Sequence, residues 1–109
     1  MKRGDLVTTA AGGPYAGKLR PAVIVQSDEF QEIRSVAVCL LTGEQVEMPL
    51  LRLRLEPDAG NNLVHVSWIM VDKIVTVRRD QIGRCFGKLA DEEIGRLDRA
   101  LMVFLGLAG

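Results

Sequence analysis

The chain has few of the residues on which many small proteins depend. Among its 109 residues, aromatics make up 5%, and there are one histidine and two cysteines. Two cysteines are too few for a disulfide framework, and Cys39 lies inside an apolar run, where a small buried side chain is expected. The histidine, His65, has no cysteine or histidine neighbour in the sequence. A disulfide-stabilised fold and a metal site are therefore not predicted.

An excess of one charge is also missing, because 14 basic residues balance 14 acidic ones. This argues against a protein that coats nucleic acid through bulk charge, although a local basic face remains possible. No apolar run is long enough to span a membrane, and the first five residues lead into no signal-like segment. We expect one cytoplasmic domain, residues 1–109, with no membrane contact. A chain of this size is often helped by a partner subunit.

Short apolar runs separated by polar turns fill the first 77 residues. They predict strands at residues 5–9, 21–26, 35–41 and 51–56, then one bent strand or two over 64–71 and 73–77. The run LRLRLE at 51–56 alternates strictly. Its leucines should therefore be buried, and Arg52, Arg54 and Glu56 should meet water.

The apolar spacing changes near the end of the chain. From Asp91 onward, Ile94, Leu97, Leu101 and Phe104 recur at the spacing of an amphipathic helix. Asp91 should accept hydrogen bonds from the first free backbone donors, and Gly106 should end the helix. About five antiparallel strands followed by one helix predict a small α+β barrel.

Standard catalytic motifs are absent from the sequence. The glycines at 12, 13 and 17 precede an expected strand instead of a helix, so they do not form a phosphate-binding P-loop. No Gly-x-Ser-x-Gly motif and no plausible Cys–His pair is present.

Two residues remain as candidates for a phosphate site. Arg20 stands between the glycine-rich segment and the run at 21–26, and its position before a proline restricts it to extended geometry. Its guanidinium matches phosphate in a bidentate way. Thr42 ends the run at 35–41 beside a glycine, where a hydroxyl can approach a ligand closely. From the residues alone, two alternatives remain open. Arg20 is then a surface arginine in a turn, and Thr42 is an ordinary threonine at the end of a strand.

Five segments, in order, resemble the MazF/PemK family of toxin endoribonucleases. They are MKRGDLVT, GKLRPAVIVQSDEF, VAVCLLTGE, IMVDKIVTV and IGRCFGKLADEEIGRLDRALMVFLGL. The resemblance implies an SH3-like antiparallel β-barrel with a C-terminal helix, shared with CcdB-type gyrase poisons. It also implies a homodimeric toxin with a cognate antitoxin. The implied reaction is sequence-specific cleavage of single-stranded RNA without metal or cofactor, giving a 2′,3′-cyclic phosphate and a 5′-hydroxyl.

The same resemblance matches Arg20 and Thr42 to the family's catalytic arginine and threonine, and Asp72 to an acidic residue near the scissile phosphate. Beside these we expect Lys18 and Lys73 to contact the RNA backbone. Tyr15 is expected either to stack on a base or to pack the glycine-rich segment down.

Two alternatives to a nuclease remain. The first is a CcdB-like protein that poisons gyrase, but such proteins place a tryptophan near the C-terminus, whereas Trp68 lies in mid-chain. The second is a non-catalytic barrel that binds nucleic acid. It is favoured slightly by Met70 and Val75, which stand where some family members carry arginine.

Overall fold

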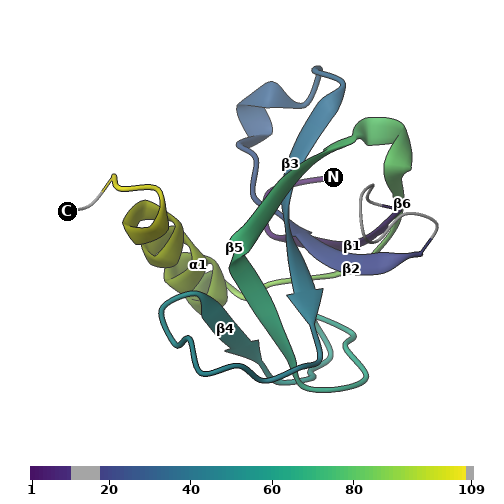
Figure 1. The fold of residues 1–109 in the computed structure, drawn as a ribbon. Helices are drawn as coiled ribbons and strands as arrows, with labels where there is room; N and C mark the ends of the chain where they lie inside the picture. The colour runs from purple at the N-terminus through teal and green to yellow at the C-terminus, as the bar shows by residue number, and fades with distance from the viewer. Residues whose placement is uncertain (11–17, 108–109) are drawn as a thin grey trace.

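The structure is a computed structural model that describes residues 1–10 and 18–107. The described residues form one curled antiparallel sheet, one α-helix and two short 3-10 helices, Asp28–Phe30 and Arg79–Gln81 (Figure 1). The elements are β1 (Asp5–Thr9), β2 (Arg20–Ile24), β3 (Ser35–Thr42), β4 (Arg52–Leu55), β5 (Ser67–Arg78), β6 (Ile82–Lys88) and α1 (Asp91–Phe104). The predicted α+β class and C-terminal helix are confirmed.

The strands follow the order β4-β5-β3-β2-β1-β6, and every neighbouring pair is antiparallel. Within the described ranges β4 and β6 each pair with one strand, so the barrel is open between them. β5 bends sharply in its middle (Figure 1). The cause is a register shift, because Cys39 of β3 faces Ile74 while Leu41 faces Ile69. Several β5 residues therefore bulge opposite Leu40, and residues 67–78 form one bent strand.

The alternation of side chains divides the buried residues between the two faces of the sheet. The main cluster, which α1 covers, includes Leu6, Val23, Leu41, Leu55, Ile69 and Leu97. The second cluster lies on the opposite face and consists of Val7, Ala22, Ile24, Val36, Val38, Leu40, Met70 and Val77. The second cluster is important for the site, because its face continues to the ends of β2 and β3.

The sequence did not predict β6, whose seven residues include two glycines. Both glycines are needed for close packing. A Cβ at Gly87 would lie 2.4 Å from the backbone oxygen of Asn61, and one at Gly83 would lie 2.6 Å from the Oγ1 atom of Thr8. The sheet therefore has six strands where about five were expected.

The helix ends as expected but begins differently. Gly106 has a φ of +75° and donates to Val103, while Leu107 donates to Met102, which together close the C-terminus. The predicted capping role of Asp91 was wrong. Asp91 is the first helical residue, and the Glu93 carboxylate accepts a hydrogen bond from the Ala90 amide at 2.8 Å.

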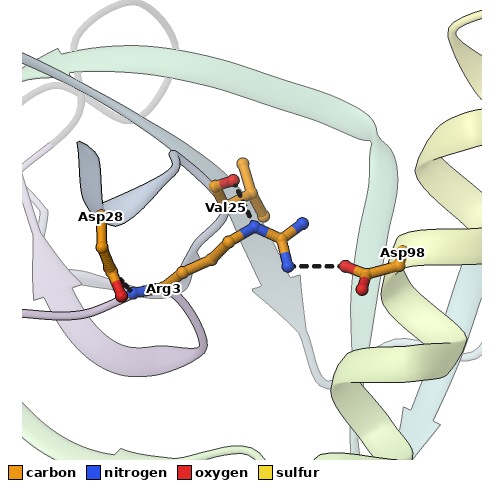
Figure 2. Close-up of polar contacts among 4 residues, drawn as sticks. All are labelled: Arg3, Val25, Asp28 and Asp98. Carbon is orange, nitrogen blue, oxygen red and sulfur yellow. Dashed lines mark hydrogen bonds and ion pairs between the residues drawn. The ribbon is translucent and has the colours of Figure 1, made fainter. Parts of the chain in front are cut away.

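Arg3 ties α1 to the sheet (Figure 2). Its backbone amide donates to Asp28 at 2.7 Å, its Nε to the Val25 carbonyl at 2.8 Å, and its NH1 group to Asp98 of α1 at 2.5 Å. One side chain therefore fixes the helix against the end of β2. Within residues 1–10 and 18–107, no helix has the length and apolar character needed to cross a membrane.

Candidate functional site

Arg20 and Thr42 lie at the same end of two neighbouring strands. Arg20 is the first residue of β2 and Thr42 is the last of β3. The register pairs Ala22 with Leu40, and continued by two residues it sets Arg20 opposite Thr42. Residues opposite each other in an antiparallel pair point to the same face, with Cβ atoms about 4.5–5.5 Å apart. The register therefore brings the two candidates, 22 residues apart in the sequence, to the same end of one strand pair.

Two further strands extend this pair into a row. Thr9 of β1 faces Arg20, Thr42 faces Trp68 of β5, and Trp68 faces Arg54 of β4. We call these five residues the cross-strand row. Their alternation places them on the face of the second cluster. Thr9 is fully buried and donates to the Gln81 carbonyl, so the half-buried or exposed members are Arg20, Thr42, Trp68 and Arg54.

Arg20 is half-buried, and its Nε atom has no solvent contact. Pro21 follows it and keeps its backbone extended at the start of β2. The backbone of Arg20 is therefore fixed as part of the sheet. Its guanidinium is suited to binding a phosphate in a fixed orientation.

Thr42 is half-buried, and its Oγ1 accepts a hydrogen bond from the Glu44 amide at 3.1 Å. This local turn uses an acceptor position of the hydroxyl and leaves its O–H as a donor. Gly43 follows, and a Cβ built there would meet no atom within 4 Å. The space that a side chain at position 43 would occupy is therefore open.

Asp72, expected near the scissile phosphate, forms a bidentate pair with Arg52. Arg52 donates from Nε to Oδ1 at 3.0 Å and from NH2 to Oδ2 at 3.1 Å. The Arg52 side chain is only 10% exposed, so the expectation that it meets water was wrong. The expectation was right for Arg54 and Glu56, which are both exposed and pair with each other. The hydrogen bonds from Arg52 are the main reason that the pKa of Asp72 is lowered.

Met70 lies opposite one member of this pair and is buried. Arg52 faces Met70 across β4 and β5, and Met70 is 8% exposed within the second cluster. Met70 is therefore a core residue. Lys73 is exposed in the same bulge of β5, one residue beyond Asp72.

The other predicted RNA contacts lie before β2. Lys18 is exposed, two residues before Arg20. Tyr15 lies outside the described residues. Of the basic residues between 67 and 88, Arg78 faces Ser35 at the other end of β3, and Arg79 donates to the Ile33 carbonyl at 3.0 Å. These two arginines do not contribute to the Arg20–Thr42 end of the sheet.

The two cysteines are poor nucleophiles. Burial raises the pKa of the Cys39 thiol to about 12, and Cys39 has no exposed surface. Cys85 is exposed, but its pKa is also raised, first by desolvation and then by the charge of Asp5. A thiolate is the reactive form, so neither residue is prepared for attack. In the part of the chain that the structure describes, no three His, Cys, Asp or Glu side chains form a group that could hold a metal ion.

Sequence reasoning missed Trp68 as a site residue. It is the single tryptophan of the chain, and it is half-buried at the start of β5. The sequence shows that the chain has one tryptophan, but the position of Trp68 opposite Thr42 depends on the pairing of two strands that are distant in the sequence.

Comparison with known proteins gives a consistent result. Residues 2–105 match the family described as PemK-like, MazF-like toxin of type II toxin-antitoxin system. A "Probable endoribonuclease MazF" from Mycolicibacterium smegmatis is 47% identical over 109 residues, covering 100% of both chains. "Endoribonuclease EndoA" from Bacillus subtilis is 25% identical, covering 98% of this chain and 96% of its own. A solved mycobacterial endoribonuclease in complex with its cognate antitoxin has a TM-score of 0.83 at 20% identity, with 100% and 98% of the chains covered. The last comparison confirms the predicted fold.

Proposed function

The chain belongs to the PemK- and MazF-like toxin family of type II toxin–antitoxin systems, and we propose that it cleaves single-stranded RNA where Arg20 and Thr42 meet. The observation that supports this site is the antiparallel register of β2 and β3, because the first residue of β2 is Arg20 and the last residue of β3, at the same end of the pair, is Thr42. The two relatives described above are named endoribonucleases, which favours a nuclease over a gyrase poison or a non-catalytic barrel.

In the proposed reaction the attacking group belongs to the RNA. The 2′-oxygen forms a bond to the neighbouring phosphorus and its proton passes to solvent water, while the bond from phosphorus to the 5′-oxygen breaks and that oxygen takes a proton from solvent water. Arg20 stabilises the negative charge that grows on the phosphoryl oxygens, and Thr42 donates a hydrogen bond to the same group. This division of labour needs no activated protein nucleophile, in agreement with the raised pKa of both thiols.

The remaining polar residues position the strand. Lys18 and Lys73 are exposed cations that contact backbone phosphates, and Tyr15 stacks on a base. Asp72 acts through Arg52, because both of its oxygens accept from that guanidinium and hold it on the face of the cross-strand row.

The end of α1 supports a homodimer. Apolar side chains in its last turn and just after it remain in water, with exposures of 44% for Met102, 54% for Val103, 39% for Phe104, 51% for Leu105 and 72% for Leu107. A patch of this kind on a small protein is typical of an interface. We further propose a cognate antitoxin as the second protein partner and the cytoplasm, where messenger RNA is present, as the location.

The test is cleavage of a long single-stranded RNA in EDTA by the wild type and by Arg20→Ala, Thr42→Ala and Arg34→Ala. Loss of one oxyanion-type charge donor should slow cleavage by about 10²- to 10³-fold, and loss of the neutral hydroxyl by about 10-fold. Arg34 is an exposed arginine at the other end of β3, so its variant should stay active. Circular dichroism checks folding. Full activity of a folded Arg20→Ala variant would refute the assignment.

A further inference from the structure

Trp68 continues the candidate site beyond Thr42. The two residues face each other across β3 and β5, and Arg54 faces Trp68 on the next strand. Since strands lie about 4.8 Å apart, the row presents Arg54, the indole, the Thr42 hydroxyl and Arg20 at successive steps on one face. An aromatic ring is therefore adjacent to the proposed phosphate site.

The burial of Trp68 differs from that of its neighbours on β5. Ile69 is fully buried in the main cluster and Met70 is 8% exposed in the second, whereas Trp68 is half-buried. Trp68 points to the same face as Met70, because the two residues are two positions apart on the strand. Trp68 is not among the described side chains that form the two core clusters. The indole thus lies at the margin of the core with part of its surface in water.

A ring in this position has a chemistry that fits one kind of ligand. Every nucleobase has a flat π face, and aromatic side chains in single-strand binding proteins stack on bases without requiring a particular sequence. Arg54 beside it is exposed, and its ion pair with Glu56 is also exposed, so a phosphate can compete for the guanidinium. The row therefore offers a stacking surface between two cations.

We propose that Trp68 stacks on the base of a nucleotide that flanks the scissile phosphate, with Arg54 contacting the next phosphate along the strand. This inference rests on the proposed function, because it takes the scissile phosphate to lie at Arg20 and Thr42. It adds a base-binding position on β5 to the RNA contacts already proposed.

The single tryptophan makes the test direct, since indole fluorescence reports on this position alone. The cut site in a long RNA is mapped first. An oligonucleotide covering it, with a 2′-deoxy sugar on the 5′ side of the cut, is then titrated into the wild-type protein. We expect saturable quenching that follows the binding curve measured by the anisotropy of the labelled strand. Strands with one abasic position should lose the quenching when that position flanks the cut.

Variants separate stacking from a structural role. Trp68→Leu should weaken binding of the oligonucleotide by about 5- to 150-fold, and it should raise KM more than it lowers kcat. Trp68→Phe should restore much of the affinity, because a smaller aromatic ring still stacks. Val64→Ala, which changes an apolar side chain that is 83% exposed just before β5, is the control and should bind as the wild type does.

The outcomes distinguish this inference from the proposed function. Saturable binding without quenching, or quenching that survives abasic substitution on both sides of the cut, would overturn the role of Trp68 and leave Arg20 and Thr42 untouched. Conversely, the Arg20→Ala variant is tested in both assays. If it still cleaves RNA and its Trp68 fluorescence is still quenched by the oligonucleotide, the catalytic role of Arg20 is refuted and the stacking of Trp68 is not.

Discussion

Removing either partner of the Arg52–Asp72 pair should destabilise the protein by more than a surface ion pair does. The pair is bidentate, at 3.0 and 3.1 Å, and the two side chains are 10% and 18% exposed. Breaking a fully buried pair costs about 3–5 kcal/mol, and breaking an exposed one costs about 0–1 kcal/mol. The observed burial places Arg52→Ala between these limits, at about 2–3 kcal/mol. Here the unpaired Asp72 carboxylate contributes most of the cost.

The expected change is large enough for thermal unfolding to detect. For a chain of 109 residues, about 1 kcal/mol changes Tm by about 4 °C. Arg52→Ala and Asp72→Ala should therefore each lower Tm by about 8–12 °C. The double variant should be little worse than either single one, because each single change already leaves the other charge without its partner. Protein concentration must be held constant, since a dimer's Tm depends on it.

The pair also predicts how stability depends on pH. The pKa of Asp72 is lowered in the folded protein, so folding favours the ionised carboxylate. That contribution is fully present above the unfolded pKa, near the ordinary value of 3.8, and is lost as the pH falls through the lower folded value. The difference in stability between wild type and Arg52→Ala should therefore narrow below about pH 4. If at pH 7 the double variant loses as much stability as the two single variants together, within about 0.5 kcal/mol, the reasoning about the Arg52–Asp72 pair is refuted.

Three more predictions concern the reaction, the core and the assembly. An RNA with one 2′-deoxy sugar on the 5′ side of the cut should bind but stay intact in a gel assay, and cleavage at that position would mean that water or a side chain attacks. Asn61→Ala should lower the free energy of unfolding by about 3 kcal/mol or more in urea, because the fully buried side chain bonds three backbone groups, of Glu56, Asp58 and Leu63; a change under about 1 kcal/mol would contradict it. Light scattering at micromolar concentration should give the mass of a dimer for the wild type and a lower mass for Leu105→Ser. A monomeric mass for the wild type would refute the homodimer.

The strands that could be predicted from the sequence are those with continuous or alternating apolar runs. β3 was found because its run is rich in β-branched residues. β5 was expected as one bent strand or two over 64–71 and 73–77, and it is one strand that begins at Ser67. β6 was missed because Gly83 and Gly87 resemble turn residues. In the structure they are required by the close approach of Thr8 and Asn61, and such long-range contacts leave no local pattern.

The error at Arg52 has the same origin. Strict alternation in LRLRLE predicts which residues share a face, and it does so correctly, since Leu53 and Leu55 are buried and Arg54 is exposed. It does not predict what lies opposite that face. The bulge of β5 brings Asp72 next to Arg52, and a charged side chain becomes mostly buried with its partner.

The candidate site shows where local reasoning stops. The extended geometry of Arg20 and the strand-ending position of Thr42 could be inferred from their neighbours, and the family resemblance singled out both. Their proximity is a matter of register, because a shift of one residue between β2 and β3 would send one side chain to the opposite face. Register here is fixed by burial, since Ala22 and Leu40 must both enter the second cluster. The core of the sheet therefore determines the geometry of the site, and it brings Trp68 into the row by the same constraint.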